Sequence, residues 1–548
     1  MATTITQTIV KLNVKVLQAP TASQLQQSGA IISVGGTTLA TNAYQFCGSD
    51  SAVLALLSTT GNFAELTNMA TTYFAQGQQN GLYVLELGAN TVVVDQVSAL
   101  STWLTNNPGV FYAYLTPADW DTDAVNVGSV TITDGGTGFT TAPTVTFSAP
   151  TGSNGIQATG TATIDSGGAV IGVVIIDAGA YPGQPAPAVT FETVATPAAA
   201  TLTDVAGGTL AAVTYYVTVQ TTDTAGQISS QSTEASLAVA LDYLLVVDSP
   251  TGSNLATWSV NVSTSTGTET VQATGLAIGT AWTEPTTGLI AGTTPPAASV
   301  SATGTANLVN VLNTVAGNYA NDTAQTYFFG TTTASTISQY TTNKSMFCFA
   351  DSPVAPSTEF SCAFPFYQFV LNNPNAANPL APMQYRFGFG VTPWPATGHT
   401  ADINTILTAY GNLITTGSQG GISTAILQKG TFMSGDQMSW WFGMDWFEIQ
   451  STLQLAAALI NGSNSNPPLV YNQHGINTLQ TLAEKIVDTG ISFNCLLSGS
   501  VAATPFSTYS QQNPSDYKAG IYNGLLATVV GINGFTTITF NIDALQFA

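Results

Sequence analysis

The sequence predicts an α/β domain that is interrupted by an all-β insertion. From about Ile31 to Leu115, short apolar runs alternate with helical patterns, which is typical of successive strand and helix units. This rhythm stops after Trp120 and resumes near Asn307. Exposed loops tolerate inserted domains, so we expect residues 125–300 to occupy a loop of one α/β domain.

The α/β part shows apolar strand patterns bounded by helix signals on both sides of the insertion. Asn62 with Glu65 three residues later has the spacing of a helix amino-terminal cap. We predict strands at 44–48, 82–87, 110–115, 326–329 and 346–349, and helices at 50–57, 62–75, 97–104, 308–319, 335–340 and 402–414. The predicted domain comprises residues 21–124 and 301–350, and residues 351–534 form a second, carboxyl-terminal domain.

The insertion contains two segments that resemble each other. Residues 130–147 and 173–191 each read as a strand, an Asp and Gly-rich turn, an aromatic residue, a Pro and a second strand. A repeat of this kind indicates an internal duplication, which we place at residues 125–194. Asp134 and Asp177 in the turns could bind Ca²⁺, but turn capping is the commoner role of such residues.

Residues 195–300 show strand patterns at regular spacing, which is typical of a β-sandwich. The segment resembles immunoglobulin-like or fibronectin type III modules. The complete fold class is therefore a mixed α/β core with a duplicated β-module and a β-sandwich inserted into it.

Both ends of the chain alternate apolar and polar residues as strands do. Residues 1–20 and 535–548 have no nearby hairpin partner. Each must pair with a distant segment of its own chain or with another chain, and we treat both as arms. The apolar positions of the arms include Ile5, Ile9, Val10, Phe535, Ile538 and Phe540.

One long helix is predicted in the carboxyl-terminal part. Ser434 and Gln437 have capping-box spacing, and Asn461-Gly462 provides an end signal. Seven apolar residues share one face, namely Met438, Phe442, Trp446, Ile449, Leu453, Ala457 and Ile460. Three polar residues, Asp445, Glu448 and Thr452, recur at steps of three and four and form a strip beside that face.

The composition excludes several classes of function. Only 7% of the 548 residues are charged, the net charge is −22, and no Lys or Arg lies between Lys15 and Lys344. A chain without a basic surface is a poor partner for nucleic acid or anionic membranes. No apolar run is long enough to span a membrane. Low charge with 44% hydrophobic residues suits a subunit that packs against copies of itself.

The sequence offers little for catalysis. It contains no phosphate-binding loop, HExxH, CxxC or GxSxG motif, and we expect no cofactor or metal. A pair formed by His474 and Cys495 has nothing that would activate the thiol. We expect Cys47, Cys348, Cys362 and Cys495 to be buried free thiols.

The carboxyl-terminal half carries a resemblance to a known family. Asp445-Trp446 opens an amphipathic segment, Asn466-Pro467-Pro468 follows, and Tyr471-Asn472-Gln473-His474-Gly475-Ile476 leads into the helical segment TLQTLAEKIVDTGI. This order resembles the carboxyl-terminal domain of contractile tail sheath proteins of bacteriophages. The resemblance covers residues 300–548 and, more loosely, 1–120.

The resemblance implies a structural protein and not an enzyme. Such subunits assemble helically around a tail tube, and their contraction drives the tube through the host envelope. The implied partners are other copies joined through the arms, the tail tube protein, and the baseplate and tail terminator proteins. The implied location is the virion tail after assembly in the host cytoplasm, and the strip of Asp445, Glu448 and Thr452 would face the tube.

Two other functions are compatible with the sequence. One is a different tail protein, such as a tube or fibre component with adhesive β-modules. The other is a carbohydrate-active enzyme with accessory β-domains, against which the lack of a signal peptide and of a credible carboxylate pair argues.

Overall fold

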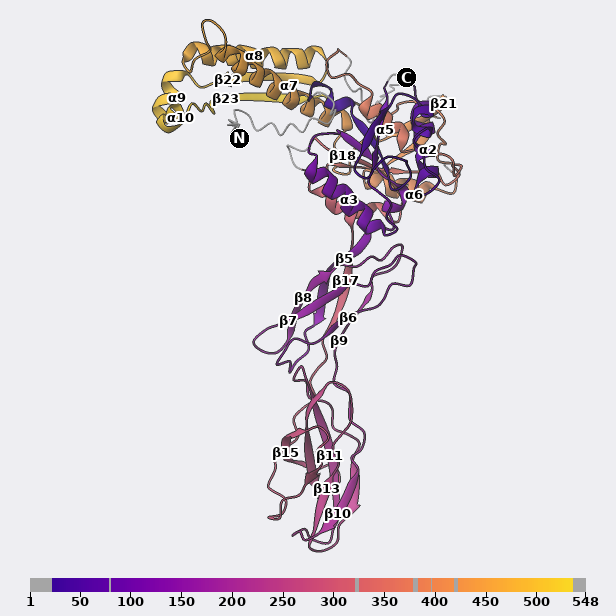
Figure 1. Ribbon diagram of the computed structural model, residues 1–548, viewed down its shortest axis with the longest axis vertical. Helices are drawn as coiled ribbons and strands as arrows, with labels where there is room; N and C mark the ends of the chain where they lie inside the picture. The colour runs from indigo at the N-terminus through magenta and orange to yellow at the C-terminus, as the bar shows by residue number, and fades with distance from the viewer. Residues whose placement is uncertain are drawn as a thin grey trace, which may run out of the picture. The chain divides into compact units, whose positions relative to one another are not determined.

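The computed structural model describes residues 22–77, 80–320, 325–377, 383–395, 397–417 and 422–535 (Figure 1). The chain forms two compact units. The split unit comprises Met1–Ala124 and Asn310–Ala548, and the inserted unit comprises Val125–Val309. The arm residues Ile5, Ile9, Val10, Ile538 and Phe540 lie outside the described residues.

An eight-stranded sheet organises the split unit. Its strand order is β2-β3-β1-β4-β18-β19-β20-β21, with parallel pairing throughout except at the two edge pairs, which are antiparallel. The strands are β1 (Gly29–Ser33), β2 (Tyr44–Cys47), β3 (Leu82–Glu86), β4 (Ala113–Leu115), β18 (Tyr327–Thr332), β19 (Met346–Ala350), β20 (Asn412–Gly417) and β21 (Ile422–Gln428).

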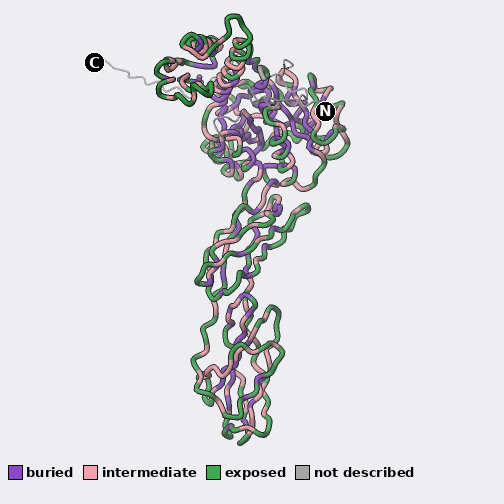
Figure 2. The backbone as a smooth tube through the Cα atoms, turned by 60° about the vertical axis from the view of Figure 1, so that its left-hand side comes forward, coloured by how far each residue is buried: buried purple, intermediate pink, exposed green. Residues whose placement is uncertain are grey.

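Helices cover both faces of this sheet. The central strands β1, β18 and β19 are buried along their whole length, as expected for parallel strands with helices on each side. One apolar core lies between the sheet and α2 (Phe63–Ala75), α5 (Ala363–Val370) and the first half of α7 (Met438–Ser463). The other lies between the sheet and α3 (Val93–Asn106), α4 (Val311–Gly317) and α6 (Thr400–Thr408). In Figure 2 the buried residues of the split unit gather in its interior.

The ends of the inserted unit meet at the split unit. The backbone N–H of Val311 donates to the carbonyl of Ala124 at 2.8 Å. The side-chain amide of Asn310 donates to the carbonyls of Trp120 and Asp121, each at 3.0 Å. The helix predicted over 308–319 begins only at Val311, because β17 (Thr303–Asn310) runs up to that point.

The predicted division of the core at residue 350 is wrong. β19 pairs with β20, and β20 pairs with β21, so residues beyond 350 extend the same sheet. The helix predicted over 402–414 ends at Thr408, since Tyr410 adopts a left-handed φ of 64° and Gly411 follows it. That turn directs the chain into β20. The sequence pattern could not distinguish a longer helix from a strand here, because Leu413 and Ile414 fit the apolar face of a helix and that of a strand equally well.

The carboxyl-terminal segment adds helices and a small sheet beyond the eight-stranded one. Helix α7 packs on α8 (Gln473–Ser492), and α8 packs on an antiparallel pair formed by β22 (Leu496–Ala503) and β23 (Leu525–Gly531). The short helices α9 (Phe506–Gln512) and α10 (Pro514–Ala519) join the two strands. The remaining short elements are α1 (Asp50–Leu54) and the 3-10 turns Ala22–Gln27, Ala118–Trp120 and Ile337–Tyr340. Among the described residues, no helix has the length and apolar character needed to cross a membrane.

The first half of the inserted unit contains the two similar segments. Asp134 Oδ1 accepts from the N–H of Gly136 at 2.8 Å, and Asp177 Oδ1 accepts from that of Gly179 at 2.9 Å. The two glycines have φ values of 65° and 67°, so the turns are alike. The strands are β5 (Val125–Asp134), β6 (Val145–Phe147), β9 (Ala188–Phe191) and β17 in one sheet, and β7 (Thr159–Ile164) and β8 (Val170–Asp177) in another.

The second half of the inserted unit is built from two further sheets around one apolar core. The strand orders are β12-β11-β14-β15 and β10-β13-β16. The strands are β10 (Leu202–Ala206), β11 (Thr214–Asp223), β12 (Ala235–Ala238), β13 (Tyr243–Val247), β14 (Leu255–Ser263), β15 (Thr270–Ala277) and β16 (Trp282–Thr283). Trp258 of β14 is 1% exposed and lies in the core between the sheets.

Replacing residues 125–309 by a short Gly/Ser linker should leave the split unit folded. The hydrogen bond between Val311 and Ala124 places the two cut ends within reach of a few residues. We expect a cooperative thermal transition and a helical circular dichroism spectrum for this variant. A matched deletion of residues 125–317 also removes α4, whose Leu312, Val315 and Ala316 are buried, and should not fold. Loss of folding in both variants would contradict the prediction.

Candidate functional site

Helix α7 begins differently from the predicted capping box. Its first residue is Met438, and Gln437 occupies the N-cap position without a side-chain bond to the helix. Ser434 Oγ instead donates to the carboxylate of Asp436 at 2.8 Å, in the loop before the helix. The helix continues through Gly462 to Ser463, so the predicted stop signal is also displaced. At the amino-terminal end, the Ser434 hydroxyl is engaged by Asp436 two residues on and does not cap the helix. At the other end, the boundary differs from the predicted one by a single residue, which is within the usual variation of helix ends.

Asp445 does not lie on a surface strip. Its side chain is 3% exposed, and Oδ2 accepts hydrogen bonds from the hydroxyls of Tyr112 and Tyr327, both at 2.7 Å. Tyr112 immediately precedes β4, and Tyr327 is the first residue of β18. The two bonds therefore attach α7 to the centre of the eight-stranded sheet. Glu448 is half-buried and Thr452 is exposed, so two residues of the predicted strip remain accessible.

Burial has a clear electrostatic effect on Asp445. Desolvation raises the pKa of its carboxyl to about 7, the two tyrosine hydrogen bonds oppose this, and the charge of Glu448 adds to the rise. Asp445 is thus a structural anchor of α7. No local sequence signal marks this role, because its partners lie 333 and 118 residues away along the chain.

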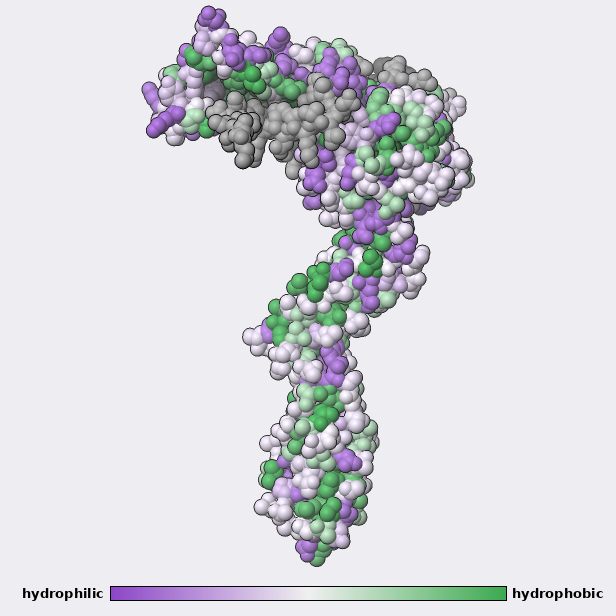
Figure 3. Space-filling model, in the orientation of Figure 1, coloured by the Kyte–Doolittle hydropathy of each residue, from purple (hydrophilic) through white to green (hydrophobic). Residues whose placement is uncertain are grey.

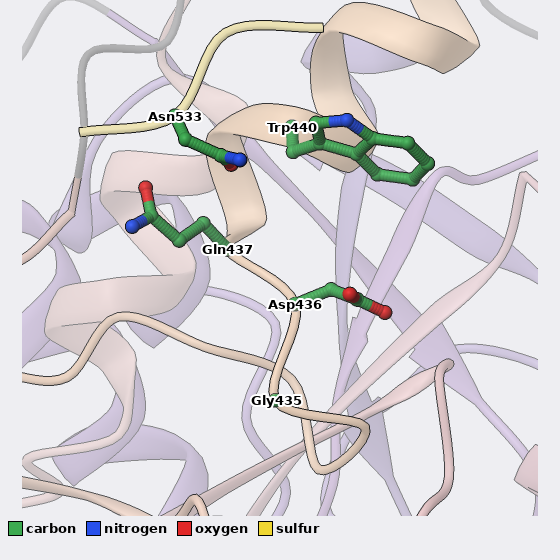
Figure 4. A pocket seen from close by; sticks show the side chains of 5 residues that line it. All are labelled: Gly435, Asp436, Gln437, Trp440 and Asn533. Carbon is green, nitrogen blue, oxygen red and sulfur yellow. The ribbon is translucent and has the colours of Figure 1, made fainter.

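Gln437 holds the segment that leads to the carboxyl-terminal arm. Its Nε2 donates to the carbonyl of Gly534 at 3.0 Å, and its Oε1 accepts from the N–H of Gly534 at 2.7 Å. A side-chain amide paired twice with one backbone unit acts like one rung of a β-ladder. Figure 4 shows Gln437 reaching toward the segment that carries Asn533, beside a small hollow also lined by Gly435, Asp436 and Trp440. Phe535, the next residue of the arm, is 82% exposed.

The β22–β23 pair is an open two-stranded sheet. One face packs on α8, while Leu497 and Leu526 are 66% and 65% exposed, and Val530 is also exposed. In the part of the chain that the structure describes, neither outer edge of the pair has a partner strand. Figure 3 shows hydrophobic surface in this region. Unpaired edges beside exposed apolar side chains are typical of a surface that receives another strand.

Catalytic groups are scarce among the described residues, which contain no group of three or more His, Cys, Asp or Glu side chains suited to a metal ion. The four cysteines are buried and unpaired. Burial raises the pKa of the Cys495 thiol to about 12, and His474 is exposed, so these two residues do not form a nucleophile and base.

Comparison with known proteins gave matches in structure alone. No protein-family model and no curated protein sequence matches the chain. Solved structures similar to it are sheath tail proteins and a prophage baseplate. The sheath tail protein of Listeria innocua has 8% identity and a TM-score of 0.31, with 92% of this chain and 94% of that chain covered.

Two further structures were found at similar levels. The sheath tail protein of Desulfitobacterium hafniense has 10% identity and a TM-score of 0.32, with 90% of this chain and 93% of that chain covered. The anti-feeding prophage baseplate has 9% identity and a TM-score of 0.31, and the match spans 43% of this chain and 65% of that one. Identities at this level do not transfer a function, which must instead follow from the residues of this chain.

The Asp445→Asn variant should change how stability depends on pH. The folded-state pKa of about 7 lies above the ordinary value of 3.8, so the folded wild-type protein binds the extra proton between these values. Its free energy of unfolding therefore decreases as pH rises from about 4 to 7, by up to about 1.4 kcal/mol per pH unit from this group.

The amide of this variant cannot titrate, so the stability difference between wild type and variant should shrink or reverse toward pH 8. Urea unfolding at several pH values measures this difference. Asp436→Asn, at an exposed carboxylate just before α7, is the matched control and should follow the wild-type profile. Parallel pH profiles for wild type and Asp445→Asn would contradict the assignment.

Proposed function

We propose that this chain is the structural subunit of a bacteriophage contractile tail sheath. The observation that carries the proposal is the open β22–β23 sheet, with unpaired edges among the described residues, in a chain whose two ends have strand-like sequences. The sequence resemblance to sheath proteins in residues 300–548 agrees with it. In this proposal the protein polymerises helically around a tube and works mechanically, without catalysis.

Strand addition is the assembly mode that the open sheet favours. An isolated pair of strands has marginal stability, and added strands supply main-chain hydrogen bonds that need no special side chains. The arms at residues 1–20 and 535–548, including Ile5, Ile9, Val10, Ile538 and Phe540, are the proposed incoming strands. Gln437 would fix where the carboxyl-terminal arm departs, since it bonds Gly534 just before Phe535.

Such contacts join different surfaces of two copies. A heterologous contact that does not close into a ring produces a helical array. The proposed mesh keeps subunits connected while rigid units reorient during contraction. The proposed further partners are the tail tube, baseplate and tail terminator proteins. Glu448 and Thr452 remain candidates for a tube-facing strip, from which Asp445 is now removed.

The second half of the inserted unit is proposed to be an immunoglobulin-like sandwich. β10 pairs with β13, β11 pairs with both β12 and β14, and β14 pairs with β15, all antiparallel. Strands that follow one another in the chain therefore often lie in different sheets, as in Greek-key sandwiches.

Removing residues 1–20 or residues 535–548 should give folded monomers that no longer form tubes. The described core does not include these segments, whereas the proposed contacts between subunits require them. Electron microscopy and analytical ultracentrifugation of full-length and truncated proteins measure the difference. Wide hollow tubes from the full-length chain support a sheath, whereas thin tubes, fibres or isolated particles indicate a different protein. Normal tubes from both truncated chains would exclude the arms as linkers.

A charge placed on the open sheet should block assembly without unfolding the protein. Leu526→Lys replaces a side chain that is 65% exposed, so the loss of folded stability should be below about 1 kcal/mol. An incoming strand would have to bury that charge, and tube formation should fall at least tenfold. Ile171→Lys, at a residue of the inserted unit that is 63% exposed, is the matched control and should assemble normally. Equal assembly of the two variants would remove the β22–β23 sheet as the docking surface.

A further inference from the structure

The end of β11 holds a buried turn built on a single carboxylate. Asp223 is 3% exposed, and its Oδ1 accepts from the N–H groups of Ala225 at 2.9 Å and Gln227 at 2.8 Å. The N–H of Asp223 in turn donates to the carbonyl of Gln227 at 3.0 Å. One carboxylate oxygen is therefore fully used in closing the turn. The other oxygen, Oδ2, is buried and has no hydrogen-bond partner among the described residues.

Two neighbouring side chains present further buried oxygens without partners. Thr221 and Gln227 are each 1% exposed, and Thr221 Oγ1 and Gln227 Oε1 accept no hydrogen bond from the described residues. Thr221 precedes Asp223 by two residues on β11, and both side chains are buried whereas Thr222 between them is half-buried. Gln227 is the residue whose backbone pairs with Asp223, and its Nε2 is occupied by the carbonyl of Val300 at 3.3 Å. Only the amide oxygen of the Gln227 side chain is left without a hydrogen-bond partner among the described residues.

Three buried oxygens without hydrogen-bond partners are energetically unfavourable unless a group from outside the chain binds them. A buried polar group without a partner costs roughly 1–3 kcal/mol, and more when it is charged. Burial raises the pKa of Asp223, and the nearby carboxylate of Glu192 raises it further, against the effect of the turn hydrogen bonds. No Lys or Arg lies between residues 16 and 343, so the inserted unit has no basic side chain of its own to neutralise these groups.

We propose that this turn binds one divalent cation of the Ca²⁺ class. The ligands would be Asp223 Oδ2, Gln227 Oε1 and Thr221 Oγ1. Oxygen atoms from carboxylate, amide and hydroxyl groups are the donors that Ca²⁺ prefers, and nitrogen or sulfur donors are not involved. The site combines one carboxylate with two oxygens from neutral side chains.

Two other Asp turns of the inserted unit provide a natural comparison. Asp134 and Asp177 cap their turns in the same way, through Oδ1 to the N–H of the residue two positions on. Their side chains are exposed, so water can satisfy the second oxygen. The turn at Asp223 differs in burial and in the unpartnered oxygens around it, and these two differences carry the assignment.

A second buried carboxylate in the same sandwich must be distinguished from this site. Glu284 is 1% exposed, and neither of its carboxylate oxygens has a partner among the described residues. Its charge acts on Tyr215, near the start of β11, whereas Asp223 ends that strand. Eight residues of extended strand separate Tyr215 from Asp223, a distance of about 26 Å. A cation bound at Glu284 would therefore be a different site.

Titration of the full-length, EDTA-treated protein with CaCl₂ tests the proposal. Isothermal calorimetry should show one Ca²⁺ per chain, and scanning calorimetry should show a rise of about 5 °C in the melting temperature of the inserted unit at saturating Ca²⁺. Asp223→Asn keeps an oxygen that can cap the turn but removes the charge, and should lose at least tenfold in affinity. Thr221→Val, which keeps the side-chain shape, should lose affinity several-fold.

Control variants test whether Ca²⁺ binds at this turn or elsewhere in the inserted unit. Asp177→Asn and Glu284→Gln should bind Ca²⁺ as the wild type does. Absence of Ca²⁺ binding by the wild-type protein would overturn the proposal. A bound proton or water molecule would then be the partner of the buried oxygens. Unchanged binding by Asp223→Asn, or loss of binding in Glu284→Gln alone, would overturn it as well, because the cation would then lie elsewhere.

Discussion

The parallel pairing of β4 with β18 is the contact on which the rest of the split unit depends. These strands lie on opposite sides of the insertion in the sequence, yet Tyr114 pairs with Phe328 and Leu115 with Phe329. Pairing is possible because the inserted unit returns the chain to its starting point, where Val311 bonds Ala124. Without this closure, the sheet would be separated into two incomplete halves.

The same junction fixes the long helix. The hydroxyls of Tyr112 and Tyr327, at the starts of the two paired strands, meet on the carboxylate of Asp445. A buried carboxylate that receives two hydrogen bonds specifies the position of α7 more sharply than apolar contacts do, because apolar packing is non-directional. Sheet closure and helix placement are therefore one coupled arrangement.

Scarcity of basic residues shapes the electrostatics of the whole chain. Burial raises the pKa of Glu65, Asp351 and Asp445 to about 7 in each case, and no cation among the described residues opposes these shifts. Carboxylates here are stabilised by hydroxyl donors, as at Asp445, or by backbone N–H groups, as at Asp223. Ion pairs can contribute little to any contact that this chain forms with another protein surface, since it has only seven Lys and Arg residues.

The sequence by itself determined the features that depend on local patterns. Five of the eight core strands (β2, β3, β4, β18 and β19), the insertion between Trp120 and Asn307, the similar turns at Asp134 and Asp177, and the existence of a long helix all follow from periodicity and from turn residues. These signals lie within a few residues of one another, so neighbouring side chains are enough to specify them.

Tertiary structure alone decided the features that join distant segments. Asp445 belongs to a polar strip by spacing, but the tyrosines that bury it are contributed by two other parts of the chain. Gln437 fits a capping box by spacing, but Gly534, 97 residues later, takes up its side chain. Residues 412–414 fit a helical pattern, but in the structure they belong to β20, which pairs with β19. In each case the deciding hydrogen bonds join residues that are far apart in the chain, and the local sequence does not specify the distant partner.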